Sequence, residues 1–510
     1  MSAPATMWDY LVLTASNALQ ARAYEMQVEA RRQCGLLPQV REVLVVPDPE
    51  GQRIGSGGST LLCLSHILER EPRRLSELRI LIVHAGGDSR RLPAYGPCGK
   101  IFVPLPSDCD APLPVTLFDR LVPDFLALPS GIPGRGQVVV AAGDALVRFD
   151  ASQVSFAKAG VTAIGCYVTP DEASRHGVFC PGPEDTVSLY LQKPSIDVQQ
   201  KRGAIDASGR VALDAGVMSL DAEAAQRLLD AFGRVEAGLA SEIDLYREIC
   251  CALGSAATLD HYLESVRASG SHWKADALSR VFPALNRIPL HVQLVPACRF
   301  LHFGSTRQLI ESGLALVQPS STVLVVNSTI APASQVRGRD SWLEACRIAA
   351  DVHLQGENVV VGVDIDAPLS LPRGACLEVL AGRDRAGMDV WFVRCYGVRD
   401  TFKQNAQFCG RPLGDWLRTA GVEAAEVWPD VSDPASRNLW NARVFPAVPA
   451  AADFRRWLWM YAPESATVEE LRAFRVADRY SAAEIAVLAN QAAFHSRRLE
   501  IWKRRPWQSE

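Results

Sequence analysis

Short apolar runs alternate with longer amphipathic segments along the first 315 residues. The runs are short and nearly unbroken, which predicts buried strands; they lie at residues 8–14, 43–46, 80–83, 136–142 and 160–168. Most segments between them space their apolar residues as helices do. Because strands that alternate with helices favour a mostly parallel sheet, we expect an α/β domain over residues 1–315.

A six-residue spacing replaces this alternation further along the chain. The apolar residues at this spacing are Leu324, Ile330, Val336, Trp342, Ile348, Leu354 and Val360. Neither helices nor alternating strands have a period of six, whereas the coils of a parallel β-helix do. We therefore expect a short parallel β-helix domain with hexapeptide-like repeats over residues 316–410. Its expected role is packing or assembly, including a homo-oligomer formed through the β-helix.

Helical periodicity and tryptophans dominate the last hundred residues. We expect a helical C-terminal region over residues 411–510, with a helix at 453–460 and one long amphipathic helix from Tyr480 through Lys503. The basic run at 497–505 is interpreted as a solvated helix face and tail, not as a nucleic-acid site.

Composition narrows the class of protein. The 510 residues are 48% hydrophobic and 22% charged, which is typical of a globular protein of several domains. A net charge of −4 gives no general affinity for polyanions, so no nucleic-acid partner is expected. No apolar run is long enough to span a membrane, and the first residues lack the pattern of a signal peptide. The 13 cysteines contain no C-x-x-C pair and are expected to be reduced thiols of a cytoplasmic protein.

Candidate chemistry centres on residues 79–105, RILIVHAGGDSRRLPAYGPCGKIFVPL. A predicted strand ends in a glycine turn, basic residues follow, and a lysine comes one short loop later. Backbone N–H groups can cradle an anion while fixed cations neutralise it, so this layout suits a triphosphate. The residues expected to present backbone to it are Gly86, Gly87, Asp88 and Ser89, with Arg91 and Lys100 as the cations. The alternative is an ordinary turn with surface arginines.

A second glycine-rich loop, Ile54-Gly-Ser-Gly-Gly-Ser-Thr60, opens a predicted helix just upstream. We expect Gly55, Gly57 and Gly58 to support the nucleotide. Glycine-rich turns between strand and helix are common, so a purely structural role stays open.

Two carboxylates each follow an apolar strand. Asp144 comes after the strand at 136–142, and Asp214 after the residues at 211–213. Ligands of α/β sheets bind beyond the carboxyl ends of strands, and an aspartate there can hold Mg²⁺ against nucleotide phosphates. We expect these two to share one Mg²⁺ ion; the alternative for Asp144 is a helix cap.

At this point the motifs resemble a known family. The stretch from His84 to Lys100 resembles the signature loop of sugar-nucleotide pyrophosphorylases. The pairing of GSGGST with HAGGxSxRLP, extended by Gly143-Asp144, His176–Phe179 and Lys193-Pro194-Ser195, resembles the fucose-1-phosphate guanylyltransferase family. That family includes stand-alone enzymes and the N-terminal half of bifunctional fucokinase/pyrophosphorylases. The resemblance covers nearly the whole chain and implies a Rossmann-like nucleotidyltransferase domain.

The resemblance also implies an activity. A sugar 1-phosphate, here β-L-fucose 1-phosphate, would attack the α-phosphorus of GTP, with Mg²⁺, to give GDP-L-fucose and pyrophosphate. Lys193 would meet the sugar phosphate, and His176 and Gly177 would line the sugar or base pocket. The structural alternatives are a buried histidine and a surface lysine. Gln192 stands where many related enzymes have glutamate, and the P-x-x-x-G-L-G-S-S loop of the sugar-kinase half is absent, so pyrophosphorylase activity alone is expected.

Three alternatives to this function make different demands on the sequence. Another sugar 1-phosphate or another NTP would leave the same motifs in place. A non-catalytic regulatory subunit that binds sugar nucleotides would not need the full set of cations and acids. A dinucleotide-binding dehydrogenase would need G-x-G-x-x-G, which the central loop lacks.

Overall fold

The computed structural model describes residues 7–87, 89–107, 110–233, 242–296, 298–317, 322–402 and 406–504. The chain forms two compact units. The first unit contains residues 1–87 and 119–301, and the second contains residues 88–118 and 302–510. The chain therefore leaves the first unit after Gly87 and returns to it at Asp119. None of the described helices is long and apolar enough to cross a membrane, and the described cysteines are free thiols.

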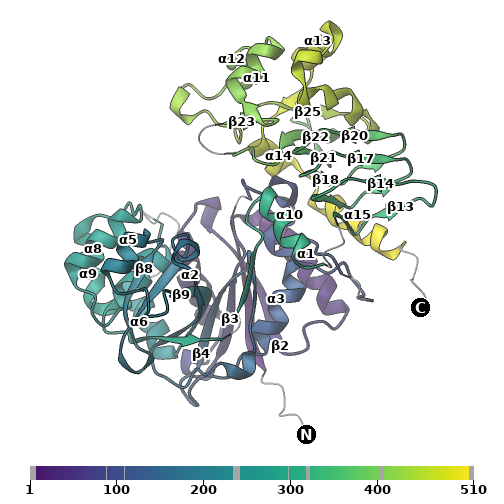
Figure 1. The fold of residues 1–510 in the computed structure, drawn as a ribbon. Helices are drawn as coiled ribbons and strands as arrows, with labels where there is room; N and C mark the ends of the chain where they lie inside the picture. Colours follow the sequence, from purple (N-terminus) through teal and green to yellow (C-terminus); the bar gives the residue numbers. More distant parts are fainter. Residues whose placement is uncertain are drawn as a thin grey trace. The chain divides into compact units, whose positions relative to one another are not determined.

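A mixed sheet forms the centre of the first unit (Figure 1). Its main strand order is β10-β6-β9-β4-β3-β1-β2, with β7 and β8 attached beside β9. The strand bounds are β1 Trp8–Ala15, β2 Val40–Pro47, β3 Arg79–His84, β4 Gln137–Ala142, β6 Val161–Val168, β7 Gly177–Pro181, β8 Val187–Gln192, β9 Val211–Leu220 and β10 Leu290–Leu294. Strands β1 to β4 are mutually parallel, but β9 runs antiparallel to both β4 and β6. The sheet is thus parallel on one side and mixed on the other.

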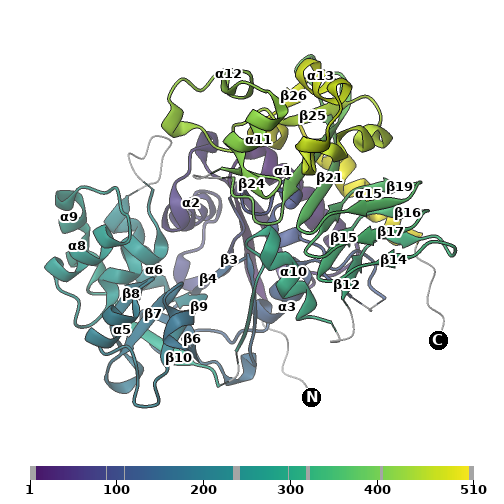
Figure 2. The same cartoon turned by 45° about the horizontal axis from the view of Figure 1, so that its top comes forward.

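Helices cover both faces of this sheet. Figures 1 and 2 show α1 (Ala18–Gln33) and α3 (Leu117–Leu126) on one face, and α2 (Gly55–Arg70) and α6 (Ala222–Phe232) on the other. Helices α8 (Leu259–Ala268) and α9 (Ala275–Leu285) extend the core on the side of α2 and α6. Asn17 caps α1 by accepting the N–H of Gln20 at 2.9 Å.

Three parallel ladders stack in the second unit (Figure 2). The first ladder contains β12 Val323–Val326, β15 Ser341–Glu344, β18 Val359–Val361 and β21 Ala375–Arg383; the second contains β13 Thr329–Ile330, β16 Arg347–Ile348 and β19 Asp364–Ile365; the third contains β14 Val336–Arg337, β17 Val352–Leu354 and β20 Leu369–Leu371. Leu324 pairs with Trp342, 18 residues later, but Trp342 pairs with Val359, 17 residues later. The strict six-residue spacing therefore matches the register between Leu324 and Trp342, but it leads to Val360, one residue past the observed partner of Trp342. Ile330 remains 43% exposed, whereas Trp342 and Val360 are fully buried.

The last hundred residues contain strands as well as helices. β22 (Asp389–Gly397) pairs antiparallel with β21, and it continues to β25 (Phe445–Val448) and β26 (Arg479–Tyr480). The helices are α11 Leu413–Ala420, α12 Ala424–Val427, α13 Val468–Val476, α14 Ala482–Leu488 and α15 Gln491–Lys503. The segment expected as a helix at 453–460 is a 3₁₀ helix, Ala451–Tyr461.

The single long helix expected from Tyr480 to Lys503 is wrong, because the segment contains two helices. At the break, the Asn490 N–H donates to the carbonyl of Ala381 in β21, and the Asn490 side chain caps α15 by accepting the N–H of Ala493. The tertiary contact with β21 thus interrupts a segment whose local spacing is helical. The solvated face expected at 497–505 is also wrong at Arg498, which is 4% exposed and paired with Glu344 at 2.5 Å.

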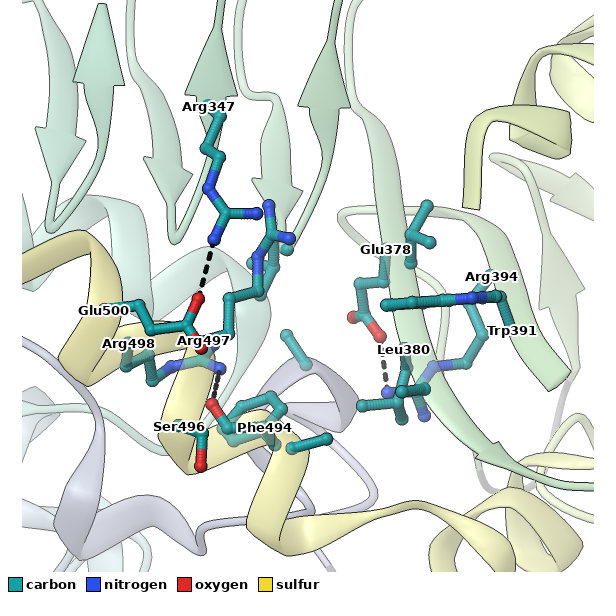
Figure 3. Close-up of a pocket in the computed structure, with 16 residues that line it drawn as sticks. Arg347, Glu378, Leu380, Trp391, Arg394, Phe494, Ser496, Arg497, Arg498 and Glu500 are labelled. Atoms are coloured by element: carbon teal, nitrogen blue, oxygen red, sulfur yellow. Dashed lines mark hydrogen bonds and ion pairs between the residues drawn. The ribbon is translucent and has the colours of Figure 1, made fainter. Parts of the chain in front are cut away.

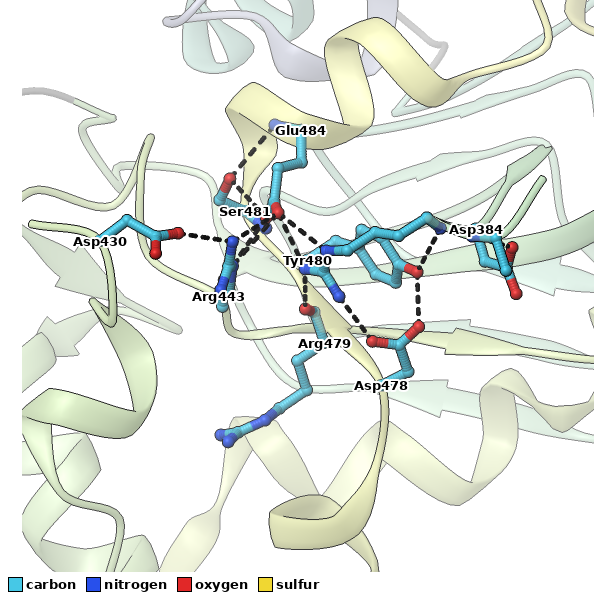
Figure 4. Close-up of polar contacts among 10 residues, drawn as sticks. Asp384, Asp430, Arg443, Asp478, Arg479, Tyr480, Ser481 and Glu484 are labelled. Carbon is cyan, nitrogen blue, oxygen red and sulfur yellow. Dashed lines mark hydrogen bonds and ion pairs between the residues drawn. The ribbon is translucent and has the colours of Figure 1, made fainter. Parts of the chain in front are cut away.

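A polar network holds α14 against its neighbours (Figure 4). Ser481 caps the helix, and Glu484 returns a carboxylate to the Ser481 N–H at 2.8 Å. Arg443 and Arg385 reach the same carboxylate at 3.0 and 2.8 Å. Burial opposes ionisation of Glu484, but these hydrogen bonds and cations outweigh it and lower the pKa of Glu484 to about 2.

Candidate active site

The parallel strands of the first unit end along one edge of its sheet. Leu13 of β1 pairs with Val83 of β3, and His84 of β3 pairs with Ala142 of β4. The segments that follow, Ala85–Gly87 and Gly143-Asp144, therefore leave the sheet at the same edge. This edge is where α/β sheets bind ligands.

The glycine turn after β3 is fixed by β1 and α1. Thr14 Oγ1 accepts the N–H groups of Ala85 and Gly86, at 3.1 and 3.3 Å. Tyr24 Oη donates to the Ala85 carbonyl at 2.6 Å, and Gln20 Nε2 donates to the Gly87 carbonyl at 3.1 Å. Gly87 has φ +126°, a conformation that glycine adopts without strain. These hydrogen bonds hold the turn in place without a ligand. One of them uses the Gly86 N–H, which therefore is not free to bind an anion.

The residues that follow the turn belong to the second unit. Asp88 lies outside the described residues. Ser89 has φ +52° and is 4% exposed, and within the described part of the chain its Oγ has no hydrogen-bond partner. Arg91 is exposed, and its carbonyl accepts the N–H of Thr306 at 2.8 Å. Lys100 is half-buried and begins a short 3₁₀ turn after Gly99, which has φ +69°.

Two aspartates lie close in sequence to the last residue pair between β4 and β9 of the first unit. Ala141 of β4 pairs with Val217 of the antiparallel strand β9. Asp144 follows the end of β4, three residues after Ala141, and Asp214 lies on β9, three residues before Val217. Both carboxylates also raise the pKa of Tyr246, which burial already raises.

Asp214 is held in one orientation. It is 6% exposed; Tyr190 Oη donates to its Oδ2 at 2.9 Å, and the Gly216 N–H donates to its Oδ1 at 2.8 Å. Burial raises the pKa of Asp214 to about 6, and the two hydrogen bonds act in the opposite direction.

Gly177 makes room for this arrangement. A Cβ at Gly177 would lie 1.8 Å from Tyr190 Oη and 3.2 Å from Asp214 Cβ, so any side chain there would displace the tyrosine. Gly177 was expected in the sugar or base pocket, and the structure gives it this packing role beside Asp214. The sequence reasoning missed Tyr190, whose only signal was its place on an apolar strand two residues before Gln192.

His176 and Lys193 are brought together at the end of the hairpin formed by β7 and β8. Gly177 pairs with Gln192, and the Lys193 N–H donates to the His176 carbonyl at 2.9 Å. The His176 ring packs edge-on against Phe300, with ring centres 5.2 Å apart. Lys193 is exposed and has φ +50°, an uncommon backbone conformation for lysine that is often found at functional sites.

The glycines of the second loop pack against residue 243. Gly57 and Gly58 donate their N–H groups to the Ile243 carbonyl at 2.8 and 3.1 Å, and a Cβ at Gly55 would lie 2.3 Å from that oxygen. These two N–H groups are therefore engaged by the protein itself. Thr60 Oγ1 lies 3.0 Å from His84 Nε2, so the helix that this loop opens also contacts the end of β3.

The described residues offer no group of three or more His, Cys, Asp or Glu side chains arranged to hold a metal ion. Asp144 and Asp214 nevertheless provide hard oxygen ligands, and Mg²⁺ sites on nucleotides commonly use one or two carboxylates plus phosphate oxygens. Each oxygen of Asp214 accepts one hydrogen bond and keeps a second lone pair. The donor set therefore fits Mg²⁺ bound together with a nucleotide.

Comparison with known proteins defines the family. The model of the fucose pyrophosphorylase domain matches residues 72–450, which include the glycine turn, both aspartates and the β7–β8 hairpin. The chain belongs to this family.

Relatives of the family cover most of the chain. The bifunctional fucokinase/GDP-fucose pyrophosphorylase of Arabidopsis thaliana is 28% identical over 94% of this chain, which spans 50% of that protein's length. The fucose-1-phosphate guanylyltransferase of Mus musculus is 24% identical over 86% of this chain and 83% of its own. Among solved structures, a mannose-1-phosphate geranyltransferase from Thermus thermophilus aligns with 76% of this chain and 95% of its own, at 12% identity and a TM-score of 0.30.

Proposed function

We propose that this protein transfers a guanylyl group from GTP to β-L-fucose 1-phosphate, forming GDP-L-fucose and pyrophosphate. The observation that carries this proposal is the family match over residues 72–450. The names of the relatives, which are fucose-1-phosphate guanylyltransferases and GDP-fucose pyrophosphorylases, support the choice of base and sugar.

The reaction joins two anions, so positioning and electrostatics must supply most of the catalysis. An oxygen of the sugar phosphate forms a bond to the α-phosphorus of GTP. The bond from the α-phosphorus to the bridging oxygen of the β-phosphate breaks, and its electron pair leaves with pyrophosphate. The rigid turn at Gly86 and Gly87 is the proposed seat of the triphosphate. Of the two glycines, Gly87 supplies the better N–H donor, because Thr14 occupies that of Gly86.

Asp144 and Asp214 would hold Mg²⁺. An ion held by these two carboxylates would supply positive charge to the nucleotide phosphates. Tyr190 and Gly216 keep the Asp214 carboxylate in position without reorganisation. Tyr190 is therefore a positioning residue in this proposal.

The remaining roles are assigned from charge and position. Lys193, whose side chain is exposed at the end of the hairpin, would meet the sugar phosphate. Arg91 and Lys100 would stabilise the transferring and leaving phosphates, and Asp88 and Ser89 would continue the backbone cradle. His176 and Gly177 would border the sugar or base, while Gly55, Gly57 and Gly58 would support the nucleotide indirectly through α2.

The three ladders of the second unit support the proposal of a short parallel β-helix within residues 316–410. Exposed Ile330, on β13 of the first coil, is the proposed contact of a homo-oligomer. Light scattering of the purified chain and of Ile330→Asp tests this. A dimer that dissociates in the variant supports the contact, and a monomeric parent protein overturns it. Free thiols, many of them buried, support a cytoplasmic location.

The direct test of the function is pyrophosphate release from each of the four NTPs with a panel of sugar 1-phosphates. We expect release with GTP and β-L-fucose 1-phosphate in the presence of Mg²⁺. Release with another pair would reassign the substrates within the same chemistry. Binding of GDP-L-fucose without release from any pair would indicate a regulatory subunit instead.

A further inference from the structure

The second unit contains a cavity of about 270 Å³ between α15 and the strands β16, β18, β21 and β22 (Figure 3). Its wall includes the guanidinium groups of Arg347, Arg394, Arg497 and Arg498 and the carboxylate of Glu378. None of these residues has a role in the transfer reaction proposed above. All of them lie within one compact unit, so the cavity is a feature of that unit alone.

Three of the arginines keep a buried donor unused. Their Nη groups are paired: Arg498 with Glu344, Arg394 with Glu378, and Arg347 with Glu500 at 3.0 Å. The Nε atom of each of these arginines is buried and has no acceptor among the described residues. Arg394 and Arg498 are only 3% and 4% exposed, so bulk solvent does not satisfy them. Buried donors without acceptors are rare and call for an explanation, which a bound acceptor would provide.

The cavity wall also includes a carboxylate that can accept further hydrogen bonds. Glu378 Oε2 is paired with Arg394, and Tyr396 Oη donates to the other oxygen, Oε1, at 2.5 Å. Each carboxylate oxygen has a second lone pair, which can accept one more hydrogen bond. A ligand that pairs with both the arginine donors and the Glu378 carboxylate carries anionic oxygens for the guanidinium groups and a hydroxyl group for Glu378. Arginine is well suited to phosphate and carboxylate oxygens because its N–H groups form a planar fork.

Aromatic and aliphatic side chains form the remaining wall. Phe494 is 6% exposed and lies under the Arg498 guanidinium, with 3.3 Å from Cζ to the ring centre. Trp391 and Leu380 face it from β22 and β21 in Figure 3. Apolar faces beside fixed polar groups are typical of small-molecule sites, where they receive the carbon skeleton of a ligand.

We propose that this cavity is a second ligand site, which binds a small phosphorylated sugar. The phosphate supplies oxygens to the unused arginine donors, a sugar hydroxyl donates to Glu378, and the ring carbons lie against Trp391 and Phe494. This goes beyond the transfer reaction and does not depend on it, because no substrate of that reaction is needed to fill the cavity.

The test is isothermal titration of the full-length protein with glucose 6-phosphate, using glucose and inorganic phosphate as partial ligands. Ala493 lines the cavity from α15, so Ala493→Leu fills it without removing an ion pair. Arg347→Ala removes one donor at a residue whose partners are exposed. Arg373→Ala is the control, because Arg373, like Arg347, is paired with a glutamate in the same unit, but it lies outside the cavity.

We expect glucose 6-phosphate to bind more tightly than glucose or phosphate alone. Ala493→Leu and Arg347→Ala should each weaken it at least tenfold, and Arg373→Ala should leave it unchanged. Circular dichroism confirms that each variant is folded. Equal affinity in the parent protein and in both cavity variants would place any binding elsewhere and overturn the proposal. Absence of binding to the folded parent protein at millimolar ligand would overturn it as well.

Discussion

At the scale of single residues, the hydroxyl of Tyr190 has the most informative position. It donates to Asp214 Oδ2 and lowers the pKa of a carboxyl that burial raises to about 6. Asp214 must be ionised to bind a cation, so activity should fall as the pH drops through this value. Tyr190→Phe removes the hydrogen bond that lowers the pKa of Asp214, so this pKa should rise further. We expect the acid limb of the kcat/KM profile to move to higher pH and kcat/KM at pH 7 to fall roughly tenfold, the scale of one hydrogen bond to a charged group.

Tyr262→Phe is the control for that measurement. Tyr262 is equally buried in the same unit, but its Oη donates to the Glu248 carbonyl, at 2.7 Å. The Tyr262→Phe variant should be less stable than the parent protein, but the acid limb of its kcat/KM profile should stay at the same pH. An unchanged profile in Tyr190→Phe would remove Tyr190 from the site.

A second prediction for single residues concerns the proposed phosphate-binding cations, Arg91 and Lys100. If they stabilise the transferring and leaving phosphates, Arg91→Ala and Lys100→Ala should each lower kcat/KM by roughly 10² with the fold intact, as for loss of one preorganised contact. Arg418→Ala, at an exposed arginine paired with Asp415 in the same unit, should keep full activity. Near-normal turnover in the first two variants would take them out of the mechanism.

At the scale of elements, the start of α2 depends on close approach to residue 243. A Cβ at Gly57 would lie 2.8 Å from Ile243 Cγ2 and 3.0 Å from its carbonyl oxygen. We expect Gly57→Ala to destabilise the protein by about 1–3 kcal/mol through overpacking, measured by urea unfolding. Gly414→Ala is the matched control, because Gly414 is also helical and a Cβ there would meet nothing within 4 Å. That variant should be neutral or more stable by up to about 1 kcal/mol. If Gly57→Ala raised only the KM for GTP, the glycine would serve the nucleotide directly.

Sequence alone could place the strands of the parallel half of the sheet and the turn that follows β3. It could also name Asp144 and Asp214 as candidates, because each follows an apolar run, but β9 continues through Asp214 to Leu220 and does not end before it. It could not show that Ile243 occupies the N–H groups of Gly57 and Gly58, since that contact joins residues far apart in the chain. It missed the break before α15 for the same reason: the Ala381 carbonyl of a distant strand binds the N–H of Asn490. The spacing of apolar residues predicts helices and strands. Hydrogen bonds between residues far apart in the chain determine where the last helix breaks and which backbone N–H groups of the glycine loop remain available to a ligand.

At the scale of the whole molecule, acid stability should depend on Glu484 in the network of Figure 4. Its pKa is lowered to about 2 in the folded state from the usual 4.5. A lowered carboxyl pKa contributes stability that is complete above pH 4.5 and is lost as the pH falls toward 2. We expect Glu484→Gln to lower stability by about 1–2 kcal/mol at pH 7 and to flatten the loss over that window, measured by thermal unfolding between pH 2 and 7. Glu469→Gln, at an exposed position in α13, should follow the parent curve.

The passage of residues 88–118 from one unit to the other has a consequence for synthesis. Tyr95 Oη accepts the indole N–H of Trp342 at 2.8 Å, and the Pro93 carbonyl accepts a hydrogen bond from Arg394 at 3.0 Å. A ribosome adding roughly 5–20 residues each second needs on the order of ten seconds or more after it completes residues 88–118 before it has synthesised Trp342 and Arg394. Throughout that interval Tyr95 is outside the exit tunnel and lacks its partner Trp342. A nascent chain paused before residue 342 should therefore be a strong client for chaperones, and release from them should coincide with emergence of the coils.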